Sequence, residues 1–297
     1  SELEAIRQYP LNPFPVSVFC PFPCSAVPAR VAAWGQALHP YYQALKLDPP
    51  GIASAAARAP FSSAAADILE EFRPPVLSFH FGLPSTELMQ RAKDWGAKIL
   101  SSATTVDEAI WLEDHGVDAI IAQGLEAGGH RGMFLTDELT TQMGSIALVP
   151  QIVRRVKVPV IAAGGIADAR GVAAAMALGA AGVQAGTAYL LALEATTSAV
   201  HRAALKSRAA AHTALTNLFT GRPARGIVNR IIRELGPISD KAPEFPLATA
   251  AITPLRTQAE AMGSDEFSPL WAGQNASACL EASAADITRA LAAGFRA

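Results

Sequence analysis

Short apolar runs alternate along the chain with longer stretches in which apolar residues recur at helical spacing. Runs such as "VDAIIA" and "VPVIAA" are apolar on both faces, which is typical of strands in a parallel sheet covered by helices. Each run is followed by a helical pattern before the next run begins, and this alternation favours an α/β fold. The predicted strands are residues 14–19, 75–81, 98–102, 117–123, 159–163 and 182–184.

The order of these elements shows no break into two halves, so it favours a (β/α)8 TIM barrel over an open doubly wound sheet. Residues 214–219 are a candidate seventh strand, and residues 283–295 form an amphipathic terminal helix with Ser283 as its N-cap. The other predicted helices are residues 86–95, 106–115, 144–156, 168–178 and 195–206.

We divide the chain into three parts. Residues 1–220 form the barrel domain, and residues 221–270, which are richer in Pro and Arg, form a peripheral helical or irregular insertion. Residues 271–297 form a C-terminal segment and helix that close the barrel. The loops that follow the strands hold the chemistry of such a barrel, and the unusual glycine segments fall there.

Composition excludes several function classes. Of the 297 residues 51% are hydrophobic and 17% charged, and the net charge of −2 gives no electrostatic footprint for nucleic acid or an anionic membrane. No apolar run is long enough to span a bilayer, and "SELEAIR" lacks the order of a signal peptide, so we expect a cytoplasmic protein. Cys20, Cys24 and Cys279 lack the partners of a zinc site, which predicts reduced thiols and no metal.

The segment "AQGLEAGGHRG", residues 122–132, is rich in glycine around His130. Glycine loses more backbone entropy on folding than other residues, so this loop requires either close approach to a ligand or a plain tight turn. Both alternatives stay open from the segment alone. We expect Glu126 and Arg131 to form an ion pair within the loop and assign them no catalytic role.

A second glycine pattern follows the next two predicted strands. Gly164-Gly165 ends one strand, Asp168 can cap the helix after it, and Gly186-Thr187 ends the following strand. Converging backbone N–H groups and a helix N-terminus favour a phosphate, although tight turns alone are the alternative. A β-branched side chain at Gly165 or Gly186 would block such an approach and disfavour a positive φ.

At this point the chain resembles a known family, the nitronate monooxygenases, formerly called 2-nitropropane dioxygenases. The resemblance is carried by "AQGLEAGGHRG", "VIAAGGIADARGVAAAMALGA", "VQAGTAYL" and "PLWAGQ", and also by "LSFHFGLP" and "TGRPARGIVNR", so it covers nearly the whole chain. It implies an FMN-dependent barrel that oxidises alkyl nitronates with dioxygen to carbonyl compounds and nitrite. Its partners would be a small nitronate or nitroalkane and dioxygen, and a homodimer is left open.

The resemblance also implies site residues. His130 would be the catalytic base, a role that suits an imidazole near neutral pH. Ser17 stands where the family usually has asparagine and keeps only a single hydroxyl for hydrogen bonding. His80 lies at a strand end and can reach the pocket, which Trp271 and Gln274 would close. The predicted cofactor-binding residues are Ser17, Gln123, Gly128, Gly129, Gly164, Gly165, Gln184, Ala185, Gly186 and Thr187.

The chain departs from the family at its start. Members open with a strand of the type "PIIQAPM", whereas residues 1–8 look like the helix that follows it. A barrel without its first strand would keep two open edges, so we expect that natural amino-terminal residues precede this sequence.

Two other functions stay open. The first is an FMN-dependent NAD(P)H reductase of the enoyl-acyl carrier protein or quinone type on the same scaffold, and the second is a flavin-free barrel lyase or isomerase with a phosphorylated substrate. FMN is predicted rather than FAD because no G-x-G-x-x-G loop offers a dinucleotide site.

Overall fold

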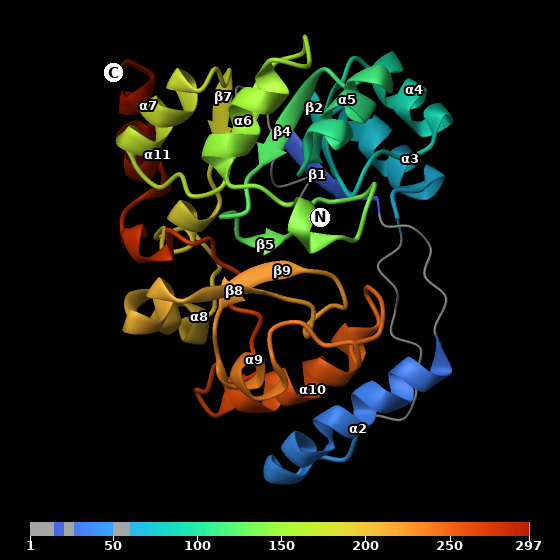
Figure 1. Ribbon diagram of the computed structural model, residues 1–297, viewed down its shortest axis with the longest axis vertical. Coiled ribbons are helices and arrows are strands. Elements are labelled where there is room, and N and C mark those ends of the chain that lie inside the picture. The colour runs from blue at the N-terminus through green and yellow to red at the C-terminus, as the bar shows by residue number, and fades with distance from the viewer. Residues whose placement is uncertain (1–14, 21–26, 50–59, 297) are drawn as a thin grey trace.

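The computed structural model describes residues 15–20, 27–49 and 60–296, and a parallel sheet lies in the upper half of the view in Figure 1. Six strands pair in the order β1-β2-β3-β4-β6-β7, and every neighbouring pair is parallel. All six strands predicted from the apolar runs are confirmed. They are β1 (Pro15–Phe19), β2 (Val76–His80), β3 (Lys98–Ala103), β4 (Ala119–Gln123), β6 (Val160–Ala163) and β7 (Gly182–Gln184).

Helices cover this sheet between successive strands. All five residues of β4 are buried, as the continuous apolar run predicted, because helices pack on the sheet and fill the space beside it. Side chains at the N-caps fix where the helices begin; Asp168, for example, accepts a hydrogen bond of 2.9 Å from the Gly171 amide. These helices are α3 (Ser63–Phe72), α4 (Thr86–Asp94), α5 (Val106–Asp114), α6 (Ser145–Val153) and α7 (Ala169–Ala177).

The architecture is therefore α/β with a six-stranded parallel sheet, and eight-stranded closure stays a prediction. Among the described residues β1 and β7 are the outer strands and do not pair with each other. The predicted helix at residues 1–8 and the question of a preceding strand lie outside the described residues, as does Cys24.

The candidate seventh strand at residues 214–219 is wrong as part of the parallel sheet. The chain there forms β8 (Thr213–Thr216), which pairs antiparallel with β9 (Ala224–Ile227). Gly221, with φ of +90°, lies in the turn that brings the chain back, so the two strands form a hairpin rather than a strand–helix unit. β9 also pairs antiparallel with β5 (Gly129–His130), which completes a three-stranded sheet.

A helical layer lies on the other side of this second sheet, as Figure 1 shows. It contains α2 (Pro28–Ala44), α9 (Arg230–Leu235) and α10 (Ala248–Ala261), and these helices share one hydrophobic core. Trp34 and Tyr42 of α2 donate hydrogen bonds to carbonyl oxygens of α10, at 3.3 Å and 2.6 Å. Residues on both sides of position 220 thus pack together, and the proposed domain boundaries stay a prediction.

The remaining helices flank these two layers. Ser283 caps α11 (Ala284–Ala292) as predicted, since its hydroxyl accepts from the Asp286 amide at 3.0 Å. None of the helices in the described part of the chain combines the length and the apolar character that crossing a membrane requires. The others are α8 (Ala199–Lys206) and short 3-10 helices at Leu139–Thr141, Thr187–Tyr189, Arg208–Ala211, Ala276–Ala278 and Ala293–Arg296.

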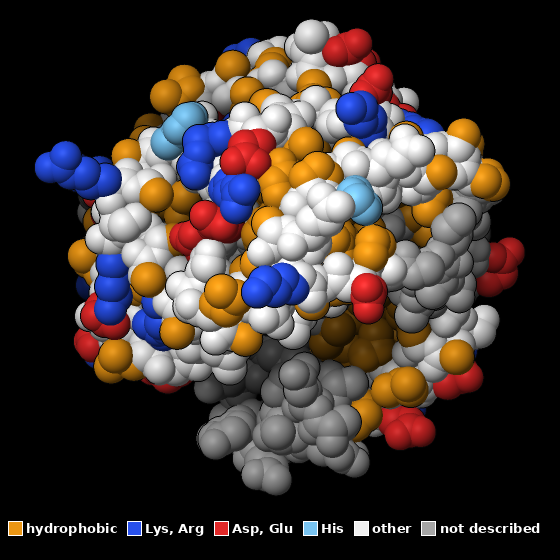
Figure 2. All heavy atoms as spheres, turned by 90° about the horizontal axis from the view of Figure 1, so that it is seen from below, with side chains coloured by type: hydrophobic (Ala, Val, Ile, Leu, Met, Phe, Trp, Pro, Cys, Tyr) orange, Lys and Arg blue, Asp and Glu red, His pale blue; other side chains and the backbone are white. Residues whose placement is uncertain are grey.

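The face seen from below is mixed in character. Figure 2 shows positive and negative side chains interspersed over it, and a hollow with hydrophobic side chains at its base. No patch of a single charge sign dominates the described residues visible on this face.

Candidate active site

A cavity of about 310 Å³ lies beyond the carboxyl ends of β4, β6 and β7. Ala163 of β6 pairs with Gln184 of β7, so the glycine segments that follow these two strands lie side by side. This arrangement brings together all the residues predicted to bind a cofactor except Ser17. The predicted residues that line this cavity are Gln123, Gly128, Gly129, Gly164, Gly165, Gln184, Ala185, Gly186 and Thr187.

The glycine segments after β6 and β7 form a cradle at one side of this cavity, and its glycines meet different structural requirements. Gly165 has φ of +74° and Gly164 has φ of +116°, a conformation that side chains disfavour. Gly186 has φ of −110°, so the expectation of a positive φ there was wrong. Gly186 lines the cavity, and a Cβ built on it would meet no described atom within 4 Å, so a larger side chain there would find open space.

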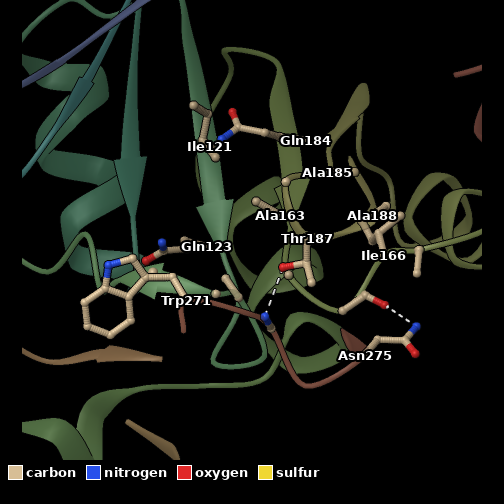
Figure 3. Close-up of a pocket in the computed structure, with 18 of the residues that line it drawn as sticks. Ile121, Gln123, Ala163, Ile166, Gln184, Ala185, Thr187, Ala188, Trp271 and Asn275 are labelled. Atoms are coloured by element: carbon tan, nitrogen blue, oxygen red, sulfur yellow. Dashed lines mark hydrogen bonds between the residues drawn. The ribbon is translucent and has the colours of Figure 1, made fainter. Parts of the chain in front are cut away.

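A strip of chain after Trp271 closes one side of the cradle (Figure 3). The Thr187 hydroxyl accepts a 3.0 Å hydrogen bond from the Gly273 amide, which leaves its own proton to donate elsewhere. Asn275 donates to the Gly165 carbonyl oxygen at 3.0 Å. A Cβ on Gly128 would lie 2.5 Å from the Gly273 nitrogen, so glycine is needed where the two segments touch.

Gln274 does not take the place expected of it. Gln274 is exposed and lines neither of the two cavities of the site. Its backbone N–H donates to the Glu126 carbonyl oxygen at 2.9 Å. Asn275, one residue later, lines the cradle instead. The motif was placed correctly, but the turn around Gly273 directs the neighbouring side chain inward.

A second cavity of about 510 Å³ adjoins the first. His130 and Ser17 line only this one, together with residues of α10 and the loop before it. The two cavities are contiguous because they share seven lining residues, which are His80, Ser102, Gln123, Gly128, Gly129, Gln184 and Trp271.

His130 stands in a cage of aromatic rings. Its ring centroid lies 5.5 Å from those of Phe245 and Trp271, 5.9 Å from Phe81 and 6.2 Å from Phe19. These rings come from four segments far apart in the sequence. On its polar edge, the His130 Nε2 lies 2.9 Å from the Thr220 hydroxyl oxygen.

Two side chains fix the backbone at His130. The Nε2 atoms of Gln123 and His80 both donate to the His130 carbonyl oxygen, at 2.9 Å and 3.1 Å. Gln123 also accepts from the Gly132 amide through Oε1 at 2.8 Å. The Gln123 side-chain amide, which was expected to face a ligand, thus binds the backbone of the loop that carries His130. Gln123 still lines both cavities, and its amide keeps one more N–H and one more lone pair for hydrogen bonding.

The surroundings of His80 keep it neutral. Its Nε2 must carry a proton to donate to the His130 carbonyl, so Nδ1 accepts from the Ser102 hydroxyl at 3.0 Å. The pKa of His80 is lowered to about 4, chiefly by burial; the bond to the His130 carbonyl opposes this shift, and the nearby Arg222 and Arg131 guanidinium groups add to it. His80 reaches the pocket, as expected, as a neutral hydrogen-bond donor.

The expected ion pair between Glu126 and Arg131 does not form in the described structure. Arg131 is fully buried and donates to the carbonyl oxygens of Gln123 and Gly124, both at 2.7 Å, and to Gln142 at 2.9 Å. Glu126 instead accepts from the amide and hydroxyl of Ser145 at the start of α6. Arg131 and Glu126 both bind backbone groups, because the tight loop leaves main-chain N–H and C=O groups that need hydrogen-bond partners.

Sequence reasoning gave no role to several residues of the second cavity, among them Thr220, Ser102 and Phe245. Thr220 lies in the quoted motif "TGRPARGIVNR" without an assigned role, and that motif was the available signal. Ser102 ends a predicted strand, and nothing in the pattern marked Phe245. No group of three or more potential metal ligands occurs among the described residues.

Comparisons with known proteins identify the family of the chain. The family model described as nitronate monooxygenase matches residues 1–294. A nitronate monooxygenase of Pseudomonas aeruginosa is 39% identical over 295 residues, which is 97% of this chain and 83% of the relative. A probable nitronate monooxygenase of Staphylococcus aureus is 40% identical and covers 92% of this chain and 77% of its own length.

Solved structures resemble the fold as well. The nitroalkane oxidase of Streptomyces ansochromogenes superposes with a TM-score of 0.89 at 35% identity, over 99% of this chain and 84% of that one. FabK of Thermotoga maritima superposes with a TM-score of 0.67 at 25% identity, over 99% and 79% of the two chains. On the whole-chain family match and these relatives, the chain belongs to the nitronate monooxygenase family of oxidoreductases.

Proposed function

We propose that this chain is an FMN-dependent enzyme that oxidises alkyl nitronates, and nitroalkanes after their deprotonation, with dioxygen to carbonyl compounds and nitrite. One observation carries the proposal. A glycine-lined cradle opens directly into a second cavity in which the His130 ring is enclosed by aromatic side chains. The arrangement supports a phosphorylated planar cofactor beside a small organic substrate.

The residues present fit a flavin mononucleotide. The open space at Gly186, the donating hydroxyl of Thr187 and the start of α7 would hold its phosphate, because N–H groups and a helix N-terminus favour an anion. Gly128 and Gly129 would let the ring system lie against the backbone, and Gln184 borders both cavities. When bound, the flavin supplies two-electron redox chemistry between the substrate and dioxygen.

The chain's own residues supply the proton chemistry. A nitroalkane must lose its α-proton before it can give up electrons, and we assign His130 as the base that accepts it. The ring is held by Thr220 on one edge and by the clamped backbone behind it, so little reorganisation is needed. The surrounding aromatic rings exclude water and favour a small apolar alkyl group beside the base.

An absorption spectrum followed by anaerobic titration tests the proposal. The purified protein is expected to be yellow, to release FMN on heating, and to be bleached by an alkyl nitronate without any nicotinamide. Bleaching by NADH but not by nitronate would favour the reductase, and a colourless protein that binds no added flavin would favour a lyase or isomerase. Recovery of FAD would contradict the prediction of FMN, which rests on the lack of a G-x-G-x-x-G loop for a dinucleotide.

A further inference from the structure

Thr220 is a polar neighbour of the His130 ring in the second cavity. Its hydroxyl oxygen lies 2.9 Å from His130 Nε2, and the carbonyl oxygen of Arg222 lies 3.3 Å from the same hydroxyl. The hydroxyl proton can therefore point at Arg222 while a lone pair faces the ring. A hydroxyl in this position can accept the Nε2 proton.

The loop that carries Thr220 is held from several sides. Asn217 exchanges two hydrogen bonds with the Ser239 backbone, at 2.8 Å and 3.0 Å, and its own carbonyl oxygen accepts from the Gly221 amide at 2.8 Å. Thr249 of α10 donates to the Phe219 carbonyl oxygen at 3.1 Å. These contacts flank Thr220, so its hydroxyl stands at a fixed position.

The backbone of Gly221 adds a steric constraint. Its φ is +90°, and a Cβ there would lie 2.1 Å from the Pro243 carbonyl oxygen. The loop is therefore packed against the segment that carries Phe245, which is itself a wall of the aromatic cage. Across the site, His130 lies opposite Ala224 in the pairing of β5 with β9, so the strand pairing sets the distance between the histidine and the loop.

We propose that Thr220 is a positioning residue for His130: its hydroxyl orients the imidazole and stabilises the imidazolium that forms when His130 takes the α-proton of a nitroalkane. The proton moves from the substrate carbon to a ring nitrogen, and the electron pair of the broken C–H bond stays on the substrate as the nitronate. Both ring nitrogens are then donors, and Thr220 accepts from Nε2. The proposal rests on the role of His130 in the proposed function.

A hydroxyl that accepts a hydrogen bond from an imidazolium stabilises it more than it would stabilise a neutral imidazole, because the hydrogen bond is charge-assisted. Thr220 therefore favours the protonated form and raises the pKa of His130 relative to a variant without the hydroxyl. A residue that only supported the fold would not move this pKa selectively.

The test compares Thr220→Val, which keeps the shape and removes the hydroxyl, with Thr220→Ser, which keeps the hydroxyl. In the flavin-loaded enzyme, Thr220→Val is expected to lower kcat/KM for a nitroalkane roughly tenfold, the worth of an ordinary hydrogen bond, and to leave nitronate turnover much less affected. The pH midpoint of nitroalkane turnover is expected to move down by about one unit, and serine to restore both values.

A second measurement does not depend on turnover. Nitrogen-15 histidine labelling, with the His130 signals assigned by their loss in His130→Asn, gives the pKa of His130 directly in each variant. Thr220→Ala provides the same comparison if the valine variant does not fold.

The outcomes separate this proposal from the proposed function. An unchanged His130 pKa and unchanged nitroalkane turnover in Thr220→Val, while His130→Asn loses that turnover, would overturn the role of Thr220 alone. Full nitroalkane turnover in His130→Asn would overturn the base assignment, and the role of Thr220 with it.

Discussion

The two adjoining cavities differ in what builds them. The first is made mostly of backbone and small residues from three loops, each of which directly follows a strand of the parallel sheet. The second is made of side chains from β1, β2, β5, α10 and the loops near Phe219, Phe245 and Trp271. One cavity is thus a product of local chain geometry, and the other of long-range packing between two layers.

Their electrostatic character differs as well. Among the described residues that line the first cavity none is a lysine, arginine, aspartate or glutamate, so an anion there would be held by N–H groups, a hydroxyl and a helix terminus. The second contains His130, and its one charged residue from the described chain, Arg256, is paired with Glu260 at 2.8 Å. Under the proposed function, the first cavity would bind the cofactor and the second would carry out the proton transfer.

Replacing His130 is expected to have the largest effect. His130→Asn should slow nitroalkane turnover by roughly 10²- to 10⁴-fold, the usual worth of a positioned base. Nitronate turnover should fall far less, because a nitronate has already lost its α-proton. Steady-state rates on a nitroalkane and on its preformed nitronate measure the difference.

Flavin content is the control for this variant. His130 does not line the first cavity, so the flavin is expected to remain at wild-type stoichiometry. Equal loss of both activities with the flavin retained would mean that His130 positions the substrate rather than removing its proton.

The same difference between the cavities explains what the sequence predicted. Apolar runs with capped helices between them predict the six parallel strands, because both signals are local. The cradle followed from them, since glycines after neighbouring parallel strands must meet at one edge. The hairpin of β8 and β9 escaped this reasoning because its strands are short and its turn contains Gly221-Arg222-Pro223 rather than a helix.

The aromatic cage could not be predicted in the same way. Phe245 and Phe81 are ordinary apolar residues in sequence, and only the packing of the second layer on the first brings them within 6 Å of His130. The partners of Arg131 were missed for a related reason. A charged residue beside an acidic one suggests an ion pair, but burial in a tight loop favours bonds to carbonyl groups that would otherwise lack partners.

The next prediction concerns the cradle. Gly186 has a φ that any residue can adopt, and its missing side chain borders open space, so Gly186→Val should fold and lose the flavin. Gly165 is a poorer choice because its φ of +74° would add backbone strain to any effect on binding. The flavin-to-protein ratio of the purified variant, with its circular dichroism spectrum, measures the outcome.

Gly182, at the start of the preceding strand β7, offers a matched control. A Cβ there would also meet no described atom within 4 Å, but Gly182 lines neither cavity. Gly182→Val should therefore keep its flavin. A yellow Gly186→Val protein with one flavin per chain would show that the phosphate is bound elsewhere.

The smallest expected effect concerns His80, which stands at the boundary between the two cavities. Its pKa is lowered to about 4, chiefly by burial, from an ordinary value of 6.5. As pH falls through this window the unfolded chain takes up the proton before the folded chain does, so the free energy of unfolding decreases. By linkage, the wild type should lose about 2 kcal/mol from this group between pH 7 and pH 5.

His80→Gln removes the titration and keeps the contacts. Its amide nitrogen can donate to the His130 carbonyl oxygen, and its amide oxygen can accept from Ser102, in place of the two ring nitrogens. Urea unfolding of both proteins at pH 7 and pH 5, with FMN in equal excess, should show the larger loss in the wild type. Other titrating groups, such as His201, cancel in this difference. Equal losses in the two proteins would mean that His80 is as easily protonated in the folded chain as in the unfolded one, and that it is not the neutral donor which fixes the backbone at His130.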